Sequence, residues 1–273
     1  MNTIMEWGTV STASIGGIIF SLLLSFALPI VLLILAKFKL KANLLSFVIG
    51  SATFIVFALL LEPIMHSVVF SATGTLLTDN IILYGLYGGL AAALFEETGR
   101  LIAMKFFMKG SLCKQNSVMY GIGHGGIEAI LLVGLTYVNN LLYAFMINSG
   151  TLQASVELVD QELQKTTFEQ IKVLWELPSW QFYMAGIERL IAIILQIALS
   201  VLVYKAVSAK SRKFWFLAFG IHFAVDFLTV VINGLGAPIW IVETALLVAV
   251  AFVAYYACKL YKESVDKEMK ITK

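Results

Sequence analysis

Charged residues are scarce in this chain, since only 13% of its 273 residues are Asp, Glu, Lys or Arg. A soluble domain usually carries about 25% charged residues, so this proportion excludes an ordinary soluble protein. Proline is also rare, with 4 residues, whereas 60% of the chain is hydrophobic and the mean hydropathy is +0.89. Apolar runs of roughly 20 residues, the length of a transmembrane helix, recur along the chain. The sequence therefore predicts an integral membrane protein.

Other sequence features are missing. Only two cysteines are present, Cys113 and Cys258, without CxxC spacing. Both fall near predicted cytoplasmic ends, where a structural disulfide is not expected. The chain has no HExxH zinc motif, no GxSxG serine motif and no aspartyl YD and GxGD pair. Nothing in the sequence indicates binding to nucleic acid.

Seven apolar segments are long enough to span a bilayer, so we expect an all-α, polytopic bundle of about seven transmembrane helices. The expected spans are residues 13–36, 44–70, 81–104, 118–146, 181–204, 214–232 and 239–258. The chain has no internal repeat and no soluble segment of domain size. Residues 1–273 are therefore interpreted as a single integral membrane domain.

The basic residues predict the orientation of these spans. Fifteen of the 19 follow the first, third, fifth or seventh span, namely Lys37, Lys39, Lys41, Lys105, Lys109, Lys114, Lys205, Lys210, Arg212, Lys213, Lys259, Lys262, Lys267, Lys270 and Lys273. Of the other four, Lys165 and Lys172 fall on the opposite side, and Arg100 and Arg189 lie inside spans. The positive-inside rule then predicts an N-terminus outside and a cytoplasmic C-terminus.

Residues 147–180 form one long loop on the predicted outer side. Its apolar residues recur at helical spacing, which predicts short amphipathic helices. These helices either lie on the outer leaflet or cover an entrance as a lid. Thr166 and Glu169 resemble a capping box, so two short helices are expected to meet near Thr166.

Ionisable residues interrupt four of the apolar spans. They are Glu96, Glu97 and Arg100 in "ALFEETGR", His124 and Glu128 in "GHGGIE", Glu188 and Arg189 in "GIERL", and His222 and Asp226 in "IHFAVD". A charge at the centre of a bilayer costs about 2.5 to 3.5 kcal/mol or more. At a rise of about 1.5 Å per residue, these groups fall in one layer in the cytoplasmic half of the membrane. Their common depth predicts one shared site.

The predicted reactive residues of this site are Glu96, Glu97, His124, His222 and Asp226. Residues predicted to orient or neutralise them are Arg100, Glu128 and Glu188. Arg100 has an alternative, since a long side chain can snorkel to the interface. Glu62 and His66 lie near the outer end of their span, where interfacial placement explains them.

Such a layer supports three kinds of chemistry. His and carboxylate ligands suit zinc, with three protein ligands and one open position in a catalytic site. Without a metal, a glutamate can act as general base on water while imidazoles stabilise an oxyanion. The same charges can also carry protons or cations, although transporters often contain the inverted repeats that this chain lacks. A buried polar network without catalysis is a further alternative.

Four motifs, "EETGR", "GIGHGGIEAI", "IERL" and "HFAVD", occur in this order over roughly residues 90–230. Together they resemble the bacterial YhfC family of intramembrane metalloproteases, within the wider group that includes type II CAAX prenyl proteases, bacteriocin-immunity (Abi) proteins and PrsW. The resemblance implies a multi-pass protein of a bacterial cell membrane that hydrolyses a membrane-embedded or membrane-proximal peptide or protein substrate. It places the cleaved peptide bond in or near the cytoplasmic half of the bilayer.

The resemblance also implies roles for individual residues. Glu96 and Glu97 match the glutamate pair of the group, one of them activating water. His124 and His222 match its two histidines, and Asp226 the residue one turn after the second. Zinc is the implied cofactor of a metalloprotease, with His124, His222 and Glu96 as its ligands, whereas a glutamate–histidine mechanism needs none. The CAAX branch has Asn at the last position and FxxxH in place of GxGHGxxE, so prenylated substrates are not implied. A non-catalytic scaffold or immunity protein and a cation- or proton-coupled transporter are the alternative functions.

Overall fold

The computed structural model describes residues 6–271, with side chains for residues 6–263. Regular structure in this range consists of helices, so the all-α prediction is confirmed. The α-helices are α1 (Thr12–Lys39), α2 (Leu44–Phe54), α3 (Glu62–Thr73), α4 (Ile81–Ile102), α5 (Lys114–Ala129), α6 (Leu135–Asn148), α7 (Thr151–Val156), α8 (Gln161–Ile171), α9 (Val173–Glu176), α10 (Ser179–Ser208), α11 (Arg212–Gly234) and α12 (Ile239–Ile271). Three π-helical stretches adjoin them: η1 (Ile55–Leu61), η2 (Ala103–Phe107) and η3 (Ile130–Gly134). Lys273 of the predicted basic tail lies outside the described residues, as do the side chains of Lys267 and Lys270.

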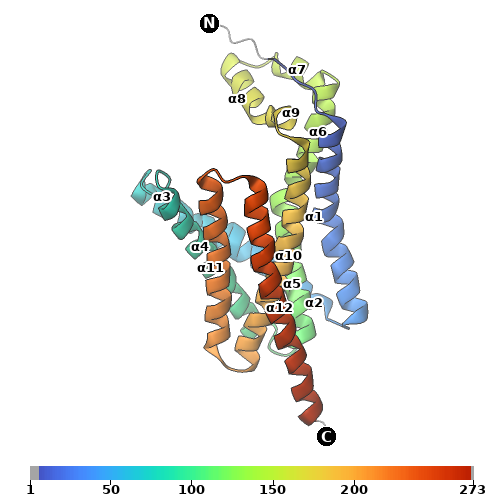
Figure 1. The fold of residues 1–273 in the computed structure, drawn as a ribbon, viewed down its shortest axis with the longest axis vertical. Helices are drawn as coiled ribbons and strands as arrows, with labels where there is room; N and C mark the ends of the chain where they lie inside the picture. Colours follow the sequence, from blue (N-terminus) through green and yellow to red (C-terminus); the bar gives the residue numbers. More distant parts are fainter. Residues whose placement is uncertain (1–5, 272–273) are drawn as a thin grey trace. The chain divides into compact units, whose positions relative to one another are not determined.

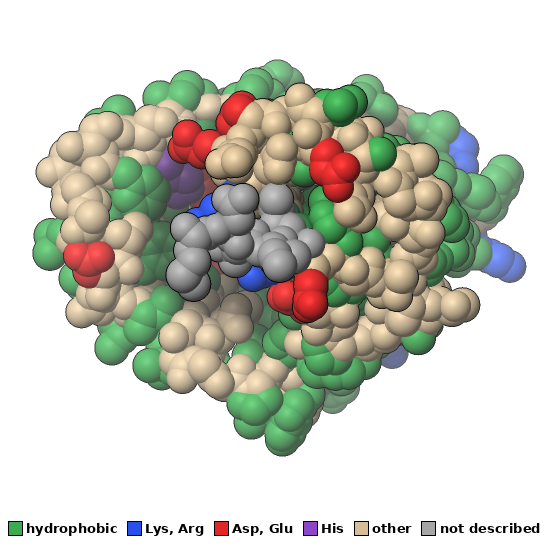
Figure 2. All heavy atoms as spheres, turned by 90° about the horizontal axis from the view of Figure 1, so that it is seen from above, with side chains coloured by type: hydrophobic (Ala, Val, Ile, Leu, Met, Phe, Trp, Pro, Cys, Tyr) green, Lys and Arg blue, Asp and Glu red, His purple; other side chains and the backbone are tan. Residues whose placement is uncertain are grey.

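Six helices in the described range are long and apolar enough to cross a membrane. They are Thr12–Lys39, Leu44–Thr73, Lys114–Asn148, Ser179–Ser208, Arg212–Gly234 and Ile239–Glu263, which match six of the seven predicted spans. Many of their large hydrophobic side chains are exposed, and Figure 2 shows such side chains along much of the edge of the face in view. An exposed apolar surface of this kind is typical of helices that face lipid.

The third predicted span is the helix α4, which is not among those six. Glu96, Glu97 and Arg100 lie in its last two turns and lower its hydropathy. The charged residues of the predicted site thus make α4 less hydrophobic than the six helices that are apolar enough to cross a membrane. The crossing of the membrane by α4 stays a prediction.

The chain divides into two compact units, and a single membrane domain over residues 1–273 stays a prediction. The first unit comprises the described residues up to Leu28 and Ala129–Leu190, with a core that includes Ile18, Ala144 and Phe182. Its helices α7, α8 and α9 form the loop that the sequence predicts to be helical.

The start of α8 corrects one prediction. Asp160 caps this helix, because its side chain accepts hydrogen bonds from the backbone N–H groups of Glu162 and Leu163. Thr166 lies inside α8, where its hydroxyl donates to the carbonyl of Glu162. The predicted meeting of two helices near Thr166 is therefore wrong, because α8 continues through this residue. An Asp before a helix is as good an N-cap as a Thr, and here the earlier residue begins the helix.

The second unit comprises Pro29–Glu128 and the chain from Ile191 onward. In it, α4 and α11 lie side by side (Figure 1), because glycines of α4 let the two backbones approach. A Cβ atom at Gly89 would lie 3.0 Å from the carbonyl oxygen of Phe223. Between α5 and α2 the approach is closer, since a Cβ at Gly123 would lie 2.1 Å from the carbonyl oxygen of Phe47. Small residues permit such packing, and here it brings polar side chains of α4, α5 and α11 within reach of one another.

Candidate active site

The two adjacent glutamates of α4 each meet a different histidine. Oε2 of Glu96 lies 2.9 Å from Nε2 of His124 on α5, and Oε1 of Glu97 lies 2.8 Å from Nδ1 of His222 on α11. Successive helical residues point about 100° apart, so neighbouring glutamates reach helices on different flanks. All four residues are buried, and the most accessible of them, Glu96, is 7% exposed. The structure thus joins both predicted histidines to one glutamate pair.

The other nitrogen of His222 faces two further carboxylates. Nε2 of His222 lies 3.4 Å from Oδ2 of Asp226, one helical turn later, and 3.9 Å from Oε2 of Glu96. The side chain of Asp226 is 33% exposed, whereas those of Glu96 and His222 are 9% and 4% exposed. Asp226 is therefore the most exposed of these three residues, and Nε2 of His222 is the imidazole nitrogen on its side.

Arg100 lies at the buried end of the cluster. Its Nε lies 3.2 Å from Oε2 of Glu97, and its Nη1 donates to the carbonyl of Gln196 at 2.7 Å and to the hydroxyl of Ser200 at 2.6 Å. Its Nη2 donates to Oε1 of Gln196. Arg100 is 0% exposed, so the snorkelling alternative is wrong. The arginine neutralises Glu97 and anchors α4 to α10.

These contacts predict that Arg100→Lys destabilises the protein. A lysine ammonium keeps the positive charge but cannot reproduce the planar fork that holds Glu97, Gln196 and Ser200. Buried acceptors left without a donor cost about 1 to 3 kcal/mol each, so the melting temperature in detergent should fall by several degrees. The exposed Lys213 offers a control, since Lys213→Arg should leave that temperature unchanged. Equal melting temperatures for wild type and Arg100→Lys would contradict the anchoring role.

Gln196 on α10 completes the cluster, and the sequence did not single it out. Its Nε2 donates to Oε2 of Glu96 at 3.0 Å and to Oε2 of Glu128 at 2.9 Å, while its Oε1 accepts from Arg100. This set of partners fixes which way the amide points. Glu128, predicted to orient the site, is thus joined to Glu96 through an amide. The sequence does contain a sign of this role. Gln196 lies four residues before Ser200 in an apolar run, and residues at this spacing share a helix face.

Three of these residues form a group that can hold a metal ion. Ligand atoms of Glu96, His124 and Glu128 all lie within 4.8 Å of one another. Oxygen and imidazole ligands suit zinc, whose bonds of about 2.0 to 2.2 Å place tetrahedral ligand atoms about 3.3 Å apart. Nε2 is the nitrogen of His124 that faces Glu96, at 2.9 Å, so it is the atom that this imidazole offers to the group. The donor set fits a divalent metal, with Glu128 in place of the predicted ligand His222.

Two other polar pairs differ in their relation to the cluster. Glu188 lies in the first unit, where it accepts a hydrogen bond from Arg189, and its assignment to the site stays a prediction. Glu62, in the second unit, follows η1 and is only 8% exposed, so it is buried within the protein, and its depth at the membrane interface stays a prediction. It lies 3.2 Å from Nε2 of His66 and near enough to interact electrostatically with Glu96. Glu62 is therefore a further buried carboxylate beside the cluster.

Comparison with known proteins places the chain in a family. The family described as YhfC intramembrane metalloprotease matches residues 24–248 of the chain. The uncharacterized membrane protein YhfC of Bacillus subtilis (strain 168) is 40% identical over 200 residues, which cover 72% of this chain and 76% of that protein. No solved structure matches. The matched range contains every residue of the cluster described above.

Proposed function

The chain belongs to the YhfC family of intramembrane metalloproteases, and from this premise we propose that it is an intramembrane endopeptidase. Its substrate is a membrane-embedded or membrane-proximal protein, and the hydrolysed peptide bond lies within or near the cytoplasmic half of the bilayer. The host is a bacterium, and the protein spans its cell membrane several times.

One observation carries this proposal: a single carboxylate oxygen, Oε2 of Glu96, is approached by both imidazoles and by an amide. It lies 2.9 Å from His124, 3.0 Å from Gln196 and 3.9 Å from Nε2 of His222. Peptide hydrolysis needs a base for water and a donor for the developing oxyanion at one place. A carboxylate beside an imidazole supplies both, and the partly exposed Asp226 marks the side from which water and substrate reach them.

Glu97 has a positioning role in this proposal. Its Oε1 holds Nδ1 of His222, and its Oε2 faces Arg100. A carboxylate on one imidazole nitrogen fixes the orientation of the ring and leaves the other nitrogen for chemistry, as in other enzymes with a histidine–carboxylate pair. His222 Nε2 is therefore the donor that meets the substrate carbonyl oxygen or the leaving amine.

Glu96 is the residue that we assign to the activation of water. Its carboxylate is the one of the pair that lies between the two histidines, whereas Glu97 is occupied by Arg100. A divalent metal such as zinc, held by Glu96, His124 and Glu128, would act there as a Lewis acid on the scissile carbonyl. Without metal, Glu96 accepts the proton of water directly and His222 stabilises the oxyanion. Both routes need Glu96 and His222 in the observed arrangement.

The proposed activity is testable without a known substrate. Membranes from cells that produce the wild-type chain or His222→Ala are compared for newly formed protein N-termini. Cleavage within or beside a transmembrane segment should appear only with the wild type. Identical N-termini in both membranes would reject the protease, and an altered proton or cation flux between them would favour the transporter.

The orientation is a separate prediction, with the N-terminus and residues 147–180 outside and the C-terminus in the cytoplasm. Ser155 on α7 and Ser208 at the end of α10 are both exposed. In a background with Cys113→Ser and Cys258→Ser, a membrane-impermeant maleimide should label Ser155→Cys in intact cells and Ser208→Cys only after permeabilisation. The reverse pattern would invert the topology and place the polar layer in the outer half of the membrane.

A further inference from the structure

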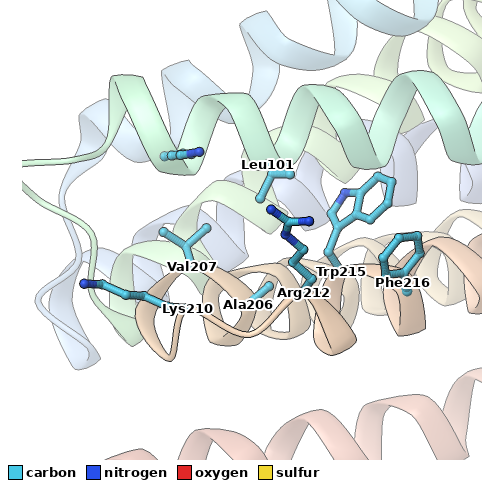
Figure 3. A pocket seen from close by; sticks show the side chains of 8 residues that line it. Leu101, Ala206, Val207, Lys210, Arg212, Trp215 and Phe216 are labelled. Atoms are coloured by element: carbon cyan, nitrogen blue, oxygen red, sulfur yellow. The ribbon is translucent and has the colours of Figure 1, made fainter.

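A cavity lies one helical turn beyond the candidate active site. It has a volume of about 410 Å³ and lies where α4 continues into η2, beside the turn from α10 to α11. Its lining includes Leu101, Lys105, Lys210, Arg212, Trp215 and Phe216. Figure 3 shows Arg212 pointing toward Leu101 of α4, beside the indole of Trp215, while the side chain of Lys210 points away from both. The proposed chemistry of the active site does not use this cavity.

The charge of this cavity is of one sign. Lys105, Lys210 and Arg212 are exposed, and among the side chains that the structure describes no acidic one lines the space. Within the described residues, none of these three makes an ion pair, although the ammonium of Lys105 lies 5.3 Å from the ring centre of Phe106. Arg212 is also the first residue of α11, whose N-cap Ser211 makes no capping bond with its side chain. The N-terminal end of a helix attracts anions, so charge and backbone favour the same kind of ligand.

The walls of the cavity are apolar. Leu101, Val207 and Phe216 face it together with the indole of Trp215. Phe216 is 61% exposed, as is typical of a side chain that meets lipid or a bound apolar group. A free inorganic anion would gain nothing from contact with these apolar walls. An amphiphile with a negative headgroup satisfies the basic residues and the apolar lining at once.

From these observations we propose that the cavity is a binding site for the phosphate-bearing headgroup of an anionic phospholipid. The headgroup phosphate contacts Arg212 and Lys105, the upper acyl chain lies along Phe216, and Lys210 contributes from the rim. The cavity lies at an end of membrane helices, which is the depth of a lipid headgroup. Basic pockets between such helices bind anionic headgroups in other membrane proteins.

The cavity and the active site share one side chain. Nε1 of Trp215 donates a hydrogen bond to the backbone carbonyl of Glu97 at 3.0 Å. The indole that forms a wall of the cavity therefore also holds the residue that orients His222. A lipid bound against Trp215 stabilises the active-site end of α4, although its binding does not depend on catalysis.

Native mass spectrometry of the full chain in detergent tests the proposal. With phosphatidylglycerol and phosphatidylcholine at equal concentrations, the wild type should retain phosphatidylglycerol selectively. Lys105→Gln combined with Arg212→Gln should weaken this binding about tenfold or more, because each basic residue near an anionic headgroup contributes several-fold. Both side chains are exposed, so the double variant is expected to fold.

A matched variant separates the cavity from general positive charge. Lys37→Gln combined with Lys39→Gln also removes two exposed charges, at the end of α1, and should bind phosphatidylglycerol like the wild type. Equal loss in the two double variants, or equal retention of phosphatidylcholine, would overturn the proposal. Displacement of the lipid by glycerol phosphate at equal concentration would assign the site to a small phosphate and overturn the lipid assignment.

Discussion

Replacing Glu96 by glutamine is expected to slow peptide cleavage at least about 100-fold, the usual loss when a general base is removed. Glutamine keeps the shape of the side chain and its contacts with His124 and Gln196, but it cannot accept a proton from water. The rate is measured in proteoliposomes, as the appearance of the new N-terminus of a substrate identified from membranes. The melting temperature should change little, because the neutral amide still fits between these partners.

Glu97→Gln should lose activity in a different way. Its carboxylate neutralises the fully buried Arg100, and breaking a buried ion pair costs about 3 to 5 kcal/mol. This variant should therefore lose both cleavage and thermal stability, whereas Glu96→Gln loses cleavage alone. Glu169→Gln, an exposed change on α8, serves as the control and should retain both. Full activity of Glu96→Gln and Glu97→Gln would show that neither glutamate is catalytic, and the scaffold or transporter interpretation would then apply.

The sequence predicted which charged residues gather because an ionisable group in an apolar span is costly and needs partners. The spacing of His222 and Asp226 placed both on one face of a helix, and the structure has them 3.4 Å apart. The helical rise per residue predicted that His124 and His222 lie at the same depth in the membrane as the glutamate pair. These predictions use only helical geometry and charge, and both can be read from a single chain.

Other features of the cluster required the packing itself. Gln196 carries no charge, so an inventory of ionisable residues passed over it, although it joins Glu96, Glu128 and Arg100. The depth of Arg100 near the end of a span allowed either snorkelling or burial. Burial of Arg100 follows only from the packing of α10 against α4, because Ser200 and a backbone carbonyl of α10 accept hydrogen bonds from the guanidinium of Arg100.

Glu62 shows a limit of reading a helix face from sequence periodicity. Its place near the outer end of a span gave no sign of a buried face, and in the structure its side chain is buried and interacts with the charges of the cluster. The π-helical stretch η1 immediately precedes it. A π-helix changes the number of residues per turn, so the face on which a following residue lies is not given by the α-helical period. Sequence periodicity therefore loses its register where such a stretch begins.

Metal content is expected to separate the two sets of candidate ligands. If Glu96, His124 and Glu128 hold the ion, the purified wild type should contain about one zinc per chain by elemental mass spectrometry. His124→Ala and Glu128→Gln should each weaken zinc binding more than about 100-fold, because loss of even an outer partner of a metal ligand costs 10- to 100-fold. His222→Ala should keep the zinc and lose the activity, since His222 acts on the substrate in this arrangement.

The same measurement distinguishes the competing arrangements because each assigns the ligands differently. With the ligand set His124, His222 and Glu96, His222→Ala would release the metal and Glu128→Gln would retain it. Asp226→Asn is the matched control, since Asp226 lies beside His222 but belongs to neither set, and its zinc content should equal that of the wild type. Treatment with a chelator should abolish cleavage, and adding zinc back should restore it. A metal-free chain that cleaves at the wild-type rate would instead establish the glutamate–histidine route, in which Glu96 takes the proton of water without a Lewis acid and His124 only holds that carboxylate in place.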